Sequence, residues 1–521
     1  MALAVLAPVM GAVSLCAAPT GLRIAIYSGT GAESSTILAL FRAVAALGDS
    51  PMAITTSDIL HGRLTKTNFD VLITPPGEDG KKCCVDHYSD GAALDQIATK
   101  AAIRAYLNSG GGVVAEEAGA YYASQNGGTF DIYSGAYTNV TNAIGKARFT
   151  IVPTSAFAIG AQPGPQEVWQ SYGGGYFPNP PANVTVIARD SSNNPTIVSQ
   201  RYGAGALIMT SYVLELCGDT NLDWTIWDNW AMGGHANSKG VWEMLGRMIG
   251  WAYNGDSSLP AVDRVSLPQG GAPVAVIAQH TSDGGAWPGL LPAVARGIEY
   301  SGHLPLAIRF QEVKNNRLTL ANFKVVVFPG GYAYGYKTGL AGAEQNIRNF
   351  LTAGGGYYGI CAGSFYAPDT IVWEKKKYAY PLAIYHGQDI GPIDDIAPWP
   401  QYVFTPITFS DPMIGNLGTI QAMYYGGGYH TVPTDAQQGS HVYTAGAFAA
   451  SSAAGKADLV RYTYGAGKVA LTTTHLEARA GTNDDWLFWD NYLDSSTTPV
   501  SNSDNPWNVM KAIFNNWLTL P

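Results

Sequence analysis

The sequence predicts an α/β fold built from two tandem domains, each a doubly wound parallel sheet. Three observations support this prediction: the chain has 521 residues, its two halves repeat each other, and each half alternates short apolar runs with helix-like segments. A chain of this length exceeds what one hydrophobic core normally organises. Alternating strands and helices are typical of parallel sheets with helices on both faces, which bind ligands at the carboxyl ends of the strands.

The repeat runs through most of the chain. Its matching segments are residues 23–26 with 273–276, 69–77 with 323–331, 172–176 with 425–429, and 221–230 with 483–492. The offset between them drifts only modestly, as small loop insertions would produce. Two domains of similar size follow from this pattern.

The second half shows the alternation of strand and helix most clearly. Residues 274–278 are a predicted strand, and residues 290–300 are a predicted helix that stops at Gly302. Residues 306–309 and 325–328 are two further short Val/Ile/Leu-rich runs, each a predicted strand. This order of elements predicts βαβ units and therefore a parallel sheet.

The predicted organisation has four parts. Residues 1–18 are expected to be a signal peptide, residues 19–253 the first domain, residues 254–272 a linker and residues 273–521 the second domain. The linker is rich in Asn, Gly, Asp, Ser and Pro and has no apolar periodicity. We expect the two domains to pack on each other.

Several features favour a secreted, glycosylated protein of eukaryotic type. The first 18 residues are apolar and uncharged and end in small residues, which is typical of a secretory signal peptide, although a buried first strand is the alternative. Glycosylation sequons begin at Asn139 and Asn183. In an oxidising compartment Cys217 could form a disulfide with Cys83 or Cys84.

Composition excludes several classes of function. With 46% hydrophobic and 13% charged residues, the chain is predicted to be globular rather than disordered. A net charge of −9 disfavours a nucleic-acid partner. No further apolar run is long enough to span a membrane, and no Cys/His spacing resembles a zinc site. We therefore expect a soluble protein without a metal, cofactor, nucleic-acid or membrane partner.

Cys361 is the leading candidate for a reactive residue. It follows the apolar run 354–360 and precedes a predicted helix, with Ala362, Gly363 and Ser364 directly after it. Small residues allow a sharp turn, and a thiol at a helix N-terminus is favoured as thiolate. The matching segment of the first half has Glu117 at this position.

A thiolate that attacks a carbonyl carbon needs a base, a group that orients the base, and N–H donors for the oxyanion. His475 and Glu477 follow a predicted strand, and residues two apart in an extended segment point the same way. Glu477 can therefore fix the imidazole while its other nitrogen faces Cys361. The backbone N–H groups of Gly331 and Ala362 are the candidate oxyanion donors.

These motifs together resemble the class I glutamine amidotransferase superfamily. The most similar member is the fungal domain described as the biotin–protein ligase N-terminal domain, which has a similar Gly-Ile-Cys-Ala-Gly elbow. The resemblance implies a flavodoxin-like fold and a triad with Cys361 as nucleophile, His475 as base and Glu477 as orienting acid. It covers the second half well and the first half as a degenerate copy.

The chain also departs from that family. The first half has Glu117 and Val213 in place of the cysteine and histidine and keeps only Glu215, so we expect it to be inert in acyl transfer. We find no biotin-ligase catalytic region, no P-loop and no attached synthetase domain. Four residues near the motifs are candidates for substrate contact: Gly330, Tyr332, Ser364 and His430.

Three functions compete. The first is a secreted cysteine hydrolase that cleaves an amide or related acyl bond through a thioester, on a small-molecule or peptide-like substrate. The second is a non-enzymatic protein that binds a small molecule or glycan in the same crevice and keeps a residual Cys361. The third, redox or glyoxalase-type chemistry, fits the positions of the histidine and the acid less well. Specificity is expected to lie in loops such as residues 378–400.

Overall fold

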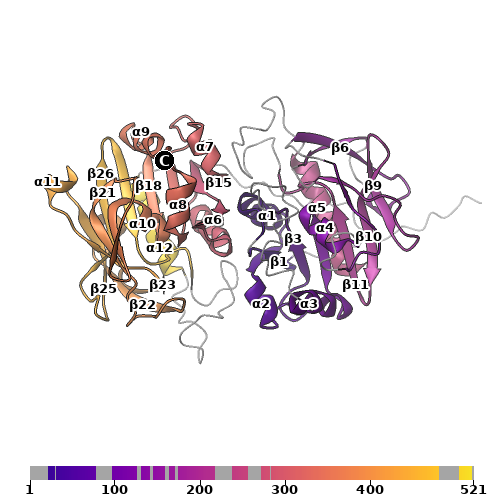
Figure 1. Cartoon of the computed structure of the whole chain (residues 1–521), viewed down its shortest axis with the longest axis horizontal. Helices are drawn as coiled ribbons and strands as arrows, with labels where there is room; N and C mark the ends of the chain where they lie inside the picture. Colours follow the sequence, from indigo (N-terminus) through magenta and orange to yellow (C-terminus); the bar gives the residue numbers. More distant parts are fainter. Residues whose placement is uncertain are drawn as a thin grey trace, which may run out of the picture.

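The computed structural model describes residues 21–29, 31–77, 97–125, 131–140, 145–158, 164–170, 174–216, 238–255, 271–281, 283–479 and 504–518. The predicted signal peptide, most of the predicted linker, and Cys83, Cys84 and Cys217 lie outside these residues. Each of the two large sheets draws all of its strands from one half of the sequence (Figure 1).

The first large sheet has the strand order β2-β1-β3-β4-β11-β10-β9-β6-β7. Its strands are β1 (Arg23–Tyr27), β2 (Ser50–Ile54), β3 (Val71–Thr74), β4 (Gly112–Glu116), β6 (Gly145–Ile151), β7 (Gln166–Gln170), β9 (Thr185–Asp190), β10 (Pro195–Tyr202) and β11 (Gly205–Thr210). The pairs from β2 to β11 are parallel. Taken in chain order, these five strands lie 2-1-3-4-5, which is the flavodoxin-like arrangement.

The second large sheet repeats this arrangement. Its parallel part is β15 (Leu304–Ile308), β12 (Pro273–Ile277), β16 (Val325–Phe328), β18 (Gly356–Ile360) and β27 (Gly467–Thr472), again 2-1-3-4-5. These strands are rich in Val, Ile and Leu and almost entirely buried, as expected for a sheet covered on both faces. The predicted α/β fold with two flavodoxin-like sheets is confirmed.

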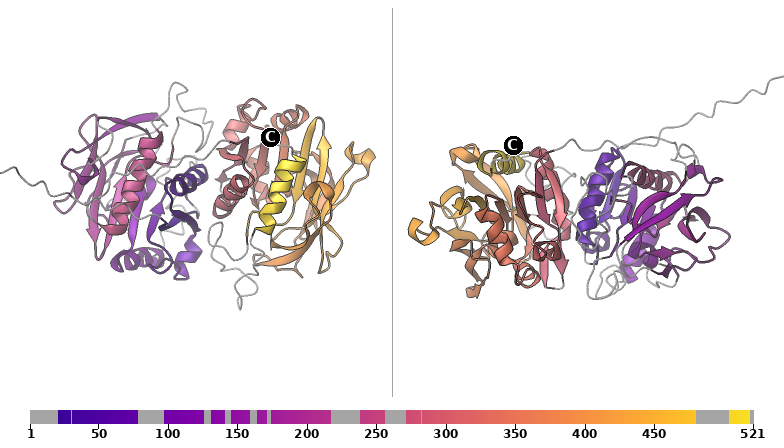
Figure 2. Two further views of the ribbon diagram at one scale, coloured as in Figure 1. Left: turned by 180° about the vertical axis from the view of Figure 1, so that it is seen from behind. Right: turned by 90° about the horizontal axis from the view of Figure 1, so that it is seen from above.

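Helices cover these sheets. In the first half they are α1 (Ser34–Ala46), α2 (Thr56–Leu60), α3 (Ile97–Asn108), α4 (Ala118–Ala123) and α5 (Ser238–Asn254). In the second half they are α6 (Leu291–Tyr300), α7 (Phe310–Lys314), α8 (Ala333–Gly339), α9 (Glu344–Thr352), α10 (Ala362–Tyr366), α11 (Asp435–Gln438) and α12 (Asn505–Ala512). Figure 1 shows α8 and α10 in front of the second sheet, and Figure 2 shows α12 on the opposite face.

The parallel strands are only part of each large sheet, which the sequence did not predict. Beyond β27 the second sheet continues through β26 (Ala457–Tyr464), β24 (Tyr429–Thr431), β21 (Tyr385–Gly391), β19 (Pro368–Trp373) and β20 (Lys376–Ala379). A branch adds β22 (Tyr402–Phe409), β23 (Gly418–Tyr425) and β25 (Tyr443–Phe448). Most of these pairs are antiparallel and need no helical crossover, so the alternation of strands and helices that predicted the parallel part does not extend to them.

Two small sheets complete the described strands. One pairs β13 (His280–Thr281), β14 (Gly284–Ala286) and β17 (Gly331–Tyr332), and the other pairs β5 (Thr138–Asn139) with β8 (Gly175–Tyr176). The sheet of three strands holds the Gly331 loop beside the carboxyl ends of the parallel strands, where a ligand is expected to bind.

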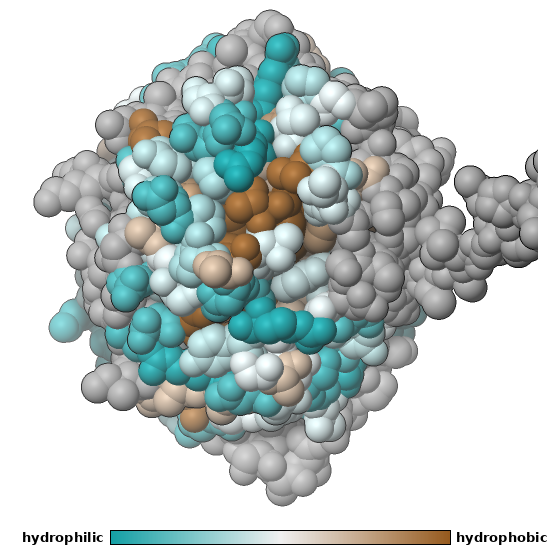
Figure 3. Space-filling model, turned by 90° about the vertical axis from the view of Figure 1, so that its right-hand side faces the viewer, coloured by the Kyte–Doolittle hydropathy of each residue, from teal (hydrophilic) through white to brown (hydrophobic). Residues whose placement is uncertain are grey.

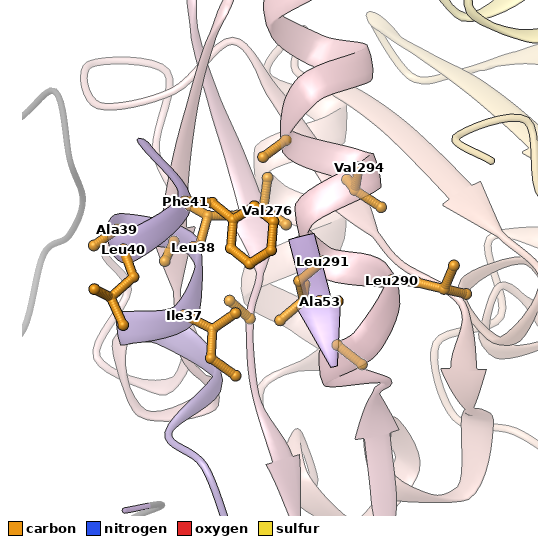
Figure 4. Packing of buried hydrophobic residues seen from close by; sticks show 14 of the residues in the cluster. Ile37, Leu38, Ala39, Leu40, Phe41, Ala53, Val276, Leu290, Leu291 and Val294 are labelled. Atoms are coloured by element: carbon orange, nitrogen blue, oxygen red, sulfur yellow. The ribbon is translucent and has the colours of Figure 1, made fainter. Parts of the chain in front are cut away.

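The two halves meet along α1 and α6. Side chains of α1 such as Phe41 lie close to Leu291 and Val294 of α6, and Ala53 of β2 lies on the same contact (Figure 4). Arg42 is buried there and donates a hydrogen bond of 2.6 Å to the Pro305 carbonyl. The far end of the first half shows polar side chains around a small apolar hollow (Figure 3). In the described part of the chain, no helix has the length and apolar character needed to span a membrane.

Candidate functional site

Cys361 occupies a strained turn between β18 and α10. Its backbone has φ 47° and ψ −107°, a region that residues other than glycine rarely adopt, and its N–H donates to the Thr472 carbonyl at 2.8 Å. Gly363 is required two residues later, because a Cβ there would lie 2.0 Å from the Phe328 carbonyl oxygen. The predicted elbow is therefore present, although α10 is only five residues long and its dipole correspondingly small.

His475 and Glu477 form a buried pair next to this turn. The Nδ1 atom of His475 lies 2.8 Å from a carboxylate oxygen of Glu477, and both side chains are almost completely buried. The predicted pairing is thus present, but its local cause differs. Strand β27 ends at Thr472, and the two residues lie in a turn that the His475 N–H anchors to the Met423 carbonyl at 2.8 Å.

The charges around His475 favour its protonated form. Burial alone lowers the pKa of this imidazole, but the negative charges of Cys361 and Glu477 outweigh burial and raise the pKa to about 10. The Nε2 atom has no hydrogen-bond partner at standard geometry, so its attraction to the nearby Cys361 sulfur is chiefly electrostatic. His475 is therefore protonated at neutral pH, and the Cys361 sulfur lies 3.8 Å from the Tyr425 carbonyl oxygen.

Glycines shape the space around the imidazole. A Cβ on Gly330 would lie 2.2 Å from Cε1 of His475, so only glycine leaves room for the ring. Gly331 has φ 148°, in the region that favours glycine, and a Cβ there would lie 2.0 Å from the Gly285 carbonyl oxygen. Gly331 and Ala362 both line a cavity that also includes Cys361, and their role as oxyanion donors stays a prediction.

Two of the substrate-contact candidates are wrong. Ser364 is fully buried and donates its hydroxyl to a carboxylate oxygen of Asp389 at 2.7 Å. His430 is also buried, with one ring nitrogen on Asp389 and the other 3.2 Å from the Leu471 carbonyl. Neither side chain lines either of the two cavities at Cys361, because α10 turns Ser364 toward Asp389 of β21, and the pairing of β21 with β24 places His430 beside the same carboxylate. Tyr332 is half exposed and lines both cavities beside Cys361, so its contact with substrate stays a prediction.

Ser364 and His430 instead belong to a polar network beneath the site. Burial lowers the pKa of His430, but Asp389 outweighs this effect and the net shift is upward. Asp458, also buried, accepts hydrogen bonds from Thr473 Oγ1 at 2.8 Å and from the Thr474 N–H at 2.9 Å. The network therefore fixes the helix that follows Cys361 and the segment that precedes His475.

Two cavities meet at Cys361. The smaller has a volume of about 90 Å³ and includes His475, Trp287 and Leu290 in its lining. The larger, of about 440 Å³, extends away from His475 over α10 and β19. Both share five residues: Gly331, Tyr332, Cys361, Trp399 and Tyr425. A substrate carbonyl at the sulfur can therefore place one group in each cavity.

The first half keeps the shape of the elbow with different chemistry. Glu117 has φ 42° and ψ −102°, close to the angles of Cys361, and Val213 is buried where the second half has His475. Burial raises the pKa of Glu116 to about 8, and burial followed by the charge of Glu116 raises the pKa of Glu215. Among the described residues of the first half, no thiol or imidazole lies at this turn.

Among the described residues, no group of three or more His, Cys, Asp or Glu side chains is arranged to hold a metal ion. The site residues that do converge are a thiol, an imidazole and a carboxylate, which suit acyl transfer.

Comparison with known proteins bears on the same region. Residues 315–389 match the family model of the biotin-protein ligase N-terminal domain. The resemblance found in the sequence is confirmed over this segment, which includes Gly330, Gly331 and Cys361 but ends before His475. No relative was found among curated proteins.

Solved structures of amidotransferase type are also similar to this chain. A glutamine amidotransferase is 15% identical, with a TM-score of 0.30, covering 41% of this chain and 93% of its own. PurLQS from Thermotoga maritima is 12% identical, with a TM-score of 0.32, covering 45% of this chain and 99% of its own.

The aromatic walls of the larger cavity were missed in the sequence. They come from separate segments: Phe365 follows the elbow, Trp373 ends β19, and Trp399 lies on the loop before β22. Trp399 falls in the loop of residues 378–400 that the sequence assigned to specificity, as do two further lining residues, Tyr378 and Tyr380. Tyr425 begins a glycine-rich motif repeated in both halves, which was the one available signal for its position.

Proposed function

We propose that the second half is a cysteine-dependent hydrolase that cleaves an amide or related acyl bond through a thioester intermediate. The observation that carries the proposal is the convergence of Cys361 and His475 on one cavity, with His475 held by Glu477. A nucleophile, a base and an orienting acid in this order form the recurring arrangement of covalent acyl transfer.

The reaction has two halves. The Cys361 thiolate attacks the carbonyl carbon, the bond to the leaving group breaks, and the leaving group takes a proton from the His475 imidazolium. His475 then accepts a proton from water, which attacks the thioester carbon, and the carbon–sulfur bond breaks to restore the thiolate. The N–H groups of Gly331 and Ala362 stabilise the negative oxygen in both halves.

The raised pKa of His475 supports the first step. An imidazolium with a pKa of about 10 is protonated before attack and can deliver this proton to the leaving group. The proposed nucleophile is the thiolate form of Cys361, because the thiolate rather than the thiol attacks a carbonyl carbon. Glu477 fixes the Nδ1 side of the ring and leaves Nε2 toward the sulfur.

Alkylation by iodoacetamide tests the reactive pair without knowledge of the substrate. We expect the alkylation of Cys361 to remain fast well below about pH 8.5, where a free thiol is protonated, and to lose this behaviour in His475→Ala. A panel of amide, peptide and ester substrates, with Cys361→Ala as blank, then tests turnover. Alkylation with the pH dependence of a free cysteine, unaffected by His475→Ala, would refute the proposal.

A non-enzymatic binding protein remains the second candidate, because the larger cavity alone would suit ligand binding. In that case Cys361→Ala and His475→Ala would leave ligand affinity unchanged, and no substrate would be turned over. The two candidates therefore differ in the response to the same two variants.

A further inference from the structure

The two cavities at Cys361 differ in a way that constrains the substrate, if the proposed hydrolase chemistry holds. Only the smaller cavity includes His475 in its lining. The group that protonates the leaving group must be in hydrogen-bond reach of it. The leaving group therefore belongs in the smaller cavity and the acyl group in the larger one.

The smaller cavity favours a small leaving group. Its volume of about 90 Å³ is about a fifth of the 440 Å³ of the larger cavity. Trp287 and Tyr425 lie edge-to-face in its lining, with ring centroids 5.5 Å apart and planes inclined at 69°. Ammonia or methylamine suits this space better than the amino side of a peptide bond.

The larger cavity is built for flat apolar groups. Its volume of about 440 Å³ lies in the range of pockets for small organic ligands. Phe365, Trp373 and Trp399 form a row of rings with centroid distances of 5.7 and 6.3 Å, and the Trp399 ring stacks on Tyr425 at 5.3 Å. Aromatic groups pack edge-to-face or offset against such walls.

The lack of cationic side chains in the lining of the larger cavity disfavours acyl groups that carry a carboxylate, such as those of acidic or amino-acid substrates. Among the described residues, no lysine, arginine or histidine lines the larger cavity, and the one charged group is Asp283 at its exposed rim. The Nζ atom of Lys337 lies 5.3 Å from the Tyr380 ring centroid, but it donates a hydrogen bond to the Ala379 carbonyl. Lys337 is not part of the cavity lining. The carboxylate of a free glutamine would therefore lose its hydration without a partner.

A sugar is disfavoured for a related reason. Its hydroxyls need several polar partners when they are buried, and this lining offers few beyond tyrosine hydroxyls and the rim carboxylate. A neutral aromatic group needs no such partners and gains from the apolar walls.

We infer that the enzyme hydrolyses small amides of the type aryl-alkyl carboxamide, with a neutral aromatic acyl group in the larger cavity and ammonia or methylamine leaving through the smaller. Tyr378 lines the larger cavity alone and Trp287 the smaller alone, so each can be altered separately. The Tyr378 side chain is 41% exposed, which makes its truncation tolerable for folding.

The experiment uses the full chain and two series of compounds. In the acyl series, 3-phenylpropanamide, acetamide and glutamine are compared by ammonia release. In the leaving-group series, the primary, N-methyl and N-benzyl amides of 3-phenylpropanoic acid are compared. Binding of 3-phenylpropanamide to Cys361→Ala is measured separately by quenching of tryptophan fluorescence, which requires no catalysis.

We expect 3-phenylpropanamide to be preferred over glutamine by at least about 100-fold in kcat/KM, and the N-benzyl amide to be inert. Tyr378→Ala should raise KM for the aromatic amide roughly 5- to 20-fold and KM for acetamide by much less. Trp287→Ala should admit the N-benzyl amide.

The possible failures are distinguishable. Hydrolysis of amides without an aromatic preference, or with glutamine preferred, would overturn this inference and leave the proposed hydrolase standing. Binding of 3-phenylpropanamide to Cys361→Ala without hydrolysis by the unaltered chain would refute the hydrolase and, with it, the assignment of the leaving group. Absence of binding to Cys361→Ala would overturn the assignment of the larger cavity.

Discussion

Replacing Gly330 by alanine is predicted to disable the site without removing any reacting group. A Cβ at this position would lie 2.2 Å from Cε1 and 2.9 Å from Nδ1 of His475. Gly330 is not among the glycines with positive φ, so the backbone tolerates alanine and the strain falls on the imidazole. The first half has Pro76 at the matching position and Val213 in place of the histidine, so the copy without an imidazole also lacks the glycine.

The size of the effect follows from the geometry. To reach an ordinary contact of 3.4 Å, the imidazole must move by about 1.2 Å relative to the new methyl group. Either the 2.8 Å hydrogen bond between His475 and Glu477 then breaks, or the imidazole ring turns away from Cys361. Misplacement of a catalytic group by about 1 Å costs roughly 100-fold in rate. Because Gly330 lines neither cavity, we expect this loss in kcat with little change in KM.

Two assays and one control variant test this prediction. Turnover is measured on the best substrate of the panel, and alkylation of Cys361 is followed across pH as a readout independent of substrate. Gly342→Ala is the control: Gly342 has φ +84° and no atom within 4 Å of its Cβ position. That variant should lose about 1 kcal/mol of stability through its left-handed backbone while keeping full activity. A folded Gly330→Ala variant with turnover and alkylation within twofold of the unaltered chain would refute the assigned role of His475.

Two further predictions concern buried carboxyl groups. Glu477→Gln keeps the shape of the side chain but removes its charge, so the pKa of His475 should fall from about 10. We expect kcat to drop at least tenfold, measured as a pH–rate profile. A profile equal to that of the unaltered chain would contradict the pairing of His475 with Glu477. The pKa of Glu116 is raised by burial from 4.5 to about 8, so the stability from this group is complete below about pH 4.5 and is lost as pH rises through about 8. Glu116→Gln should therefore flatten the decline in melting temperature between about pH 5 and pH 8, and a slope equal to that of the unaltered chain would count against the assignment.

Local signals in the sequence were sufficient for the elbow and for the pairing of His475 with Glu477. The elbow is encoded by an apolar strand followed by small residues, and such a turn forms by short-range sterics. The pair is separated by one residue, so its proximity hardly depends on the fold. Even so, the extended geometry expected for His475 and Glu477 was wrong. The strand ends at Thr472, and a backbone hydrogen bond from the His475 N–H to the Met423 carbonyl fixes the turn that follows.

The rest of the site depends on contacts between distant segments. His430 follows a glycine-rich motif that could be a surface turn, but pairing of β24 with β21 turns its ring onto Asp389 in the core. The aromatic row of Phe365, Trp373 and Trp399 is assembled from three separate segments. The residue pattern within a single helix or strand does not predict which of these side chains line the same cavity.

The duplication separates what the fold requires from what the chemistry requires. Glu117 and Cys361 share the same strained backbone, and each donates its N–H to the last residue of the neighbouring parallel strand, Thr210 or Thr472, so the strain belongs to the strand–turn–helix connection rather than to the nucleophile. Strain at an elbow therefore cannot by itself identify a catalytic residue. The differences that matter lie around the turn: Pro76 for Gly330, Val213 for His475, and a buried Glu116 where the second half has Ile360. Because these changes remove the base, the space for its ring and the apolar residue before the turn, a cysteine placed at Glu117 alone would keep a carboxylate at Glu215 but would have no imidazole beside it.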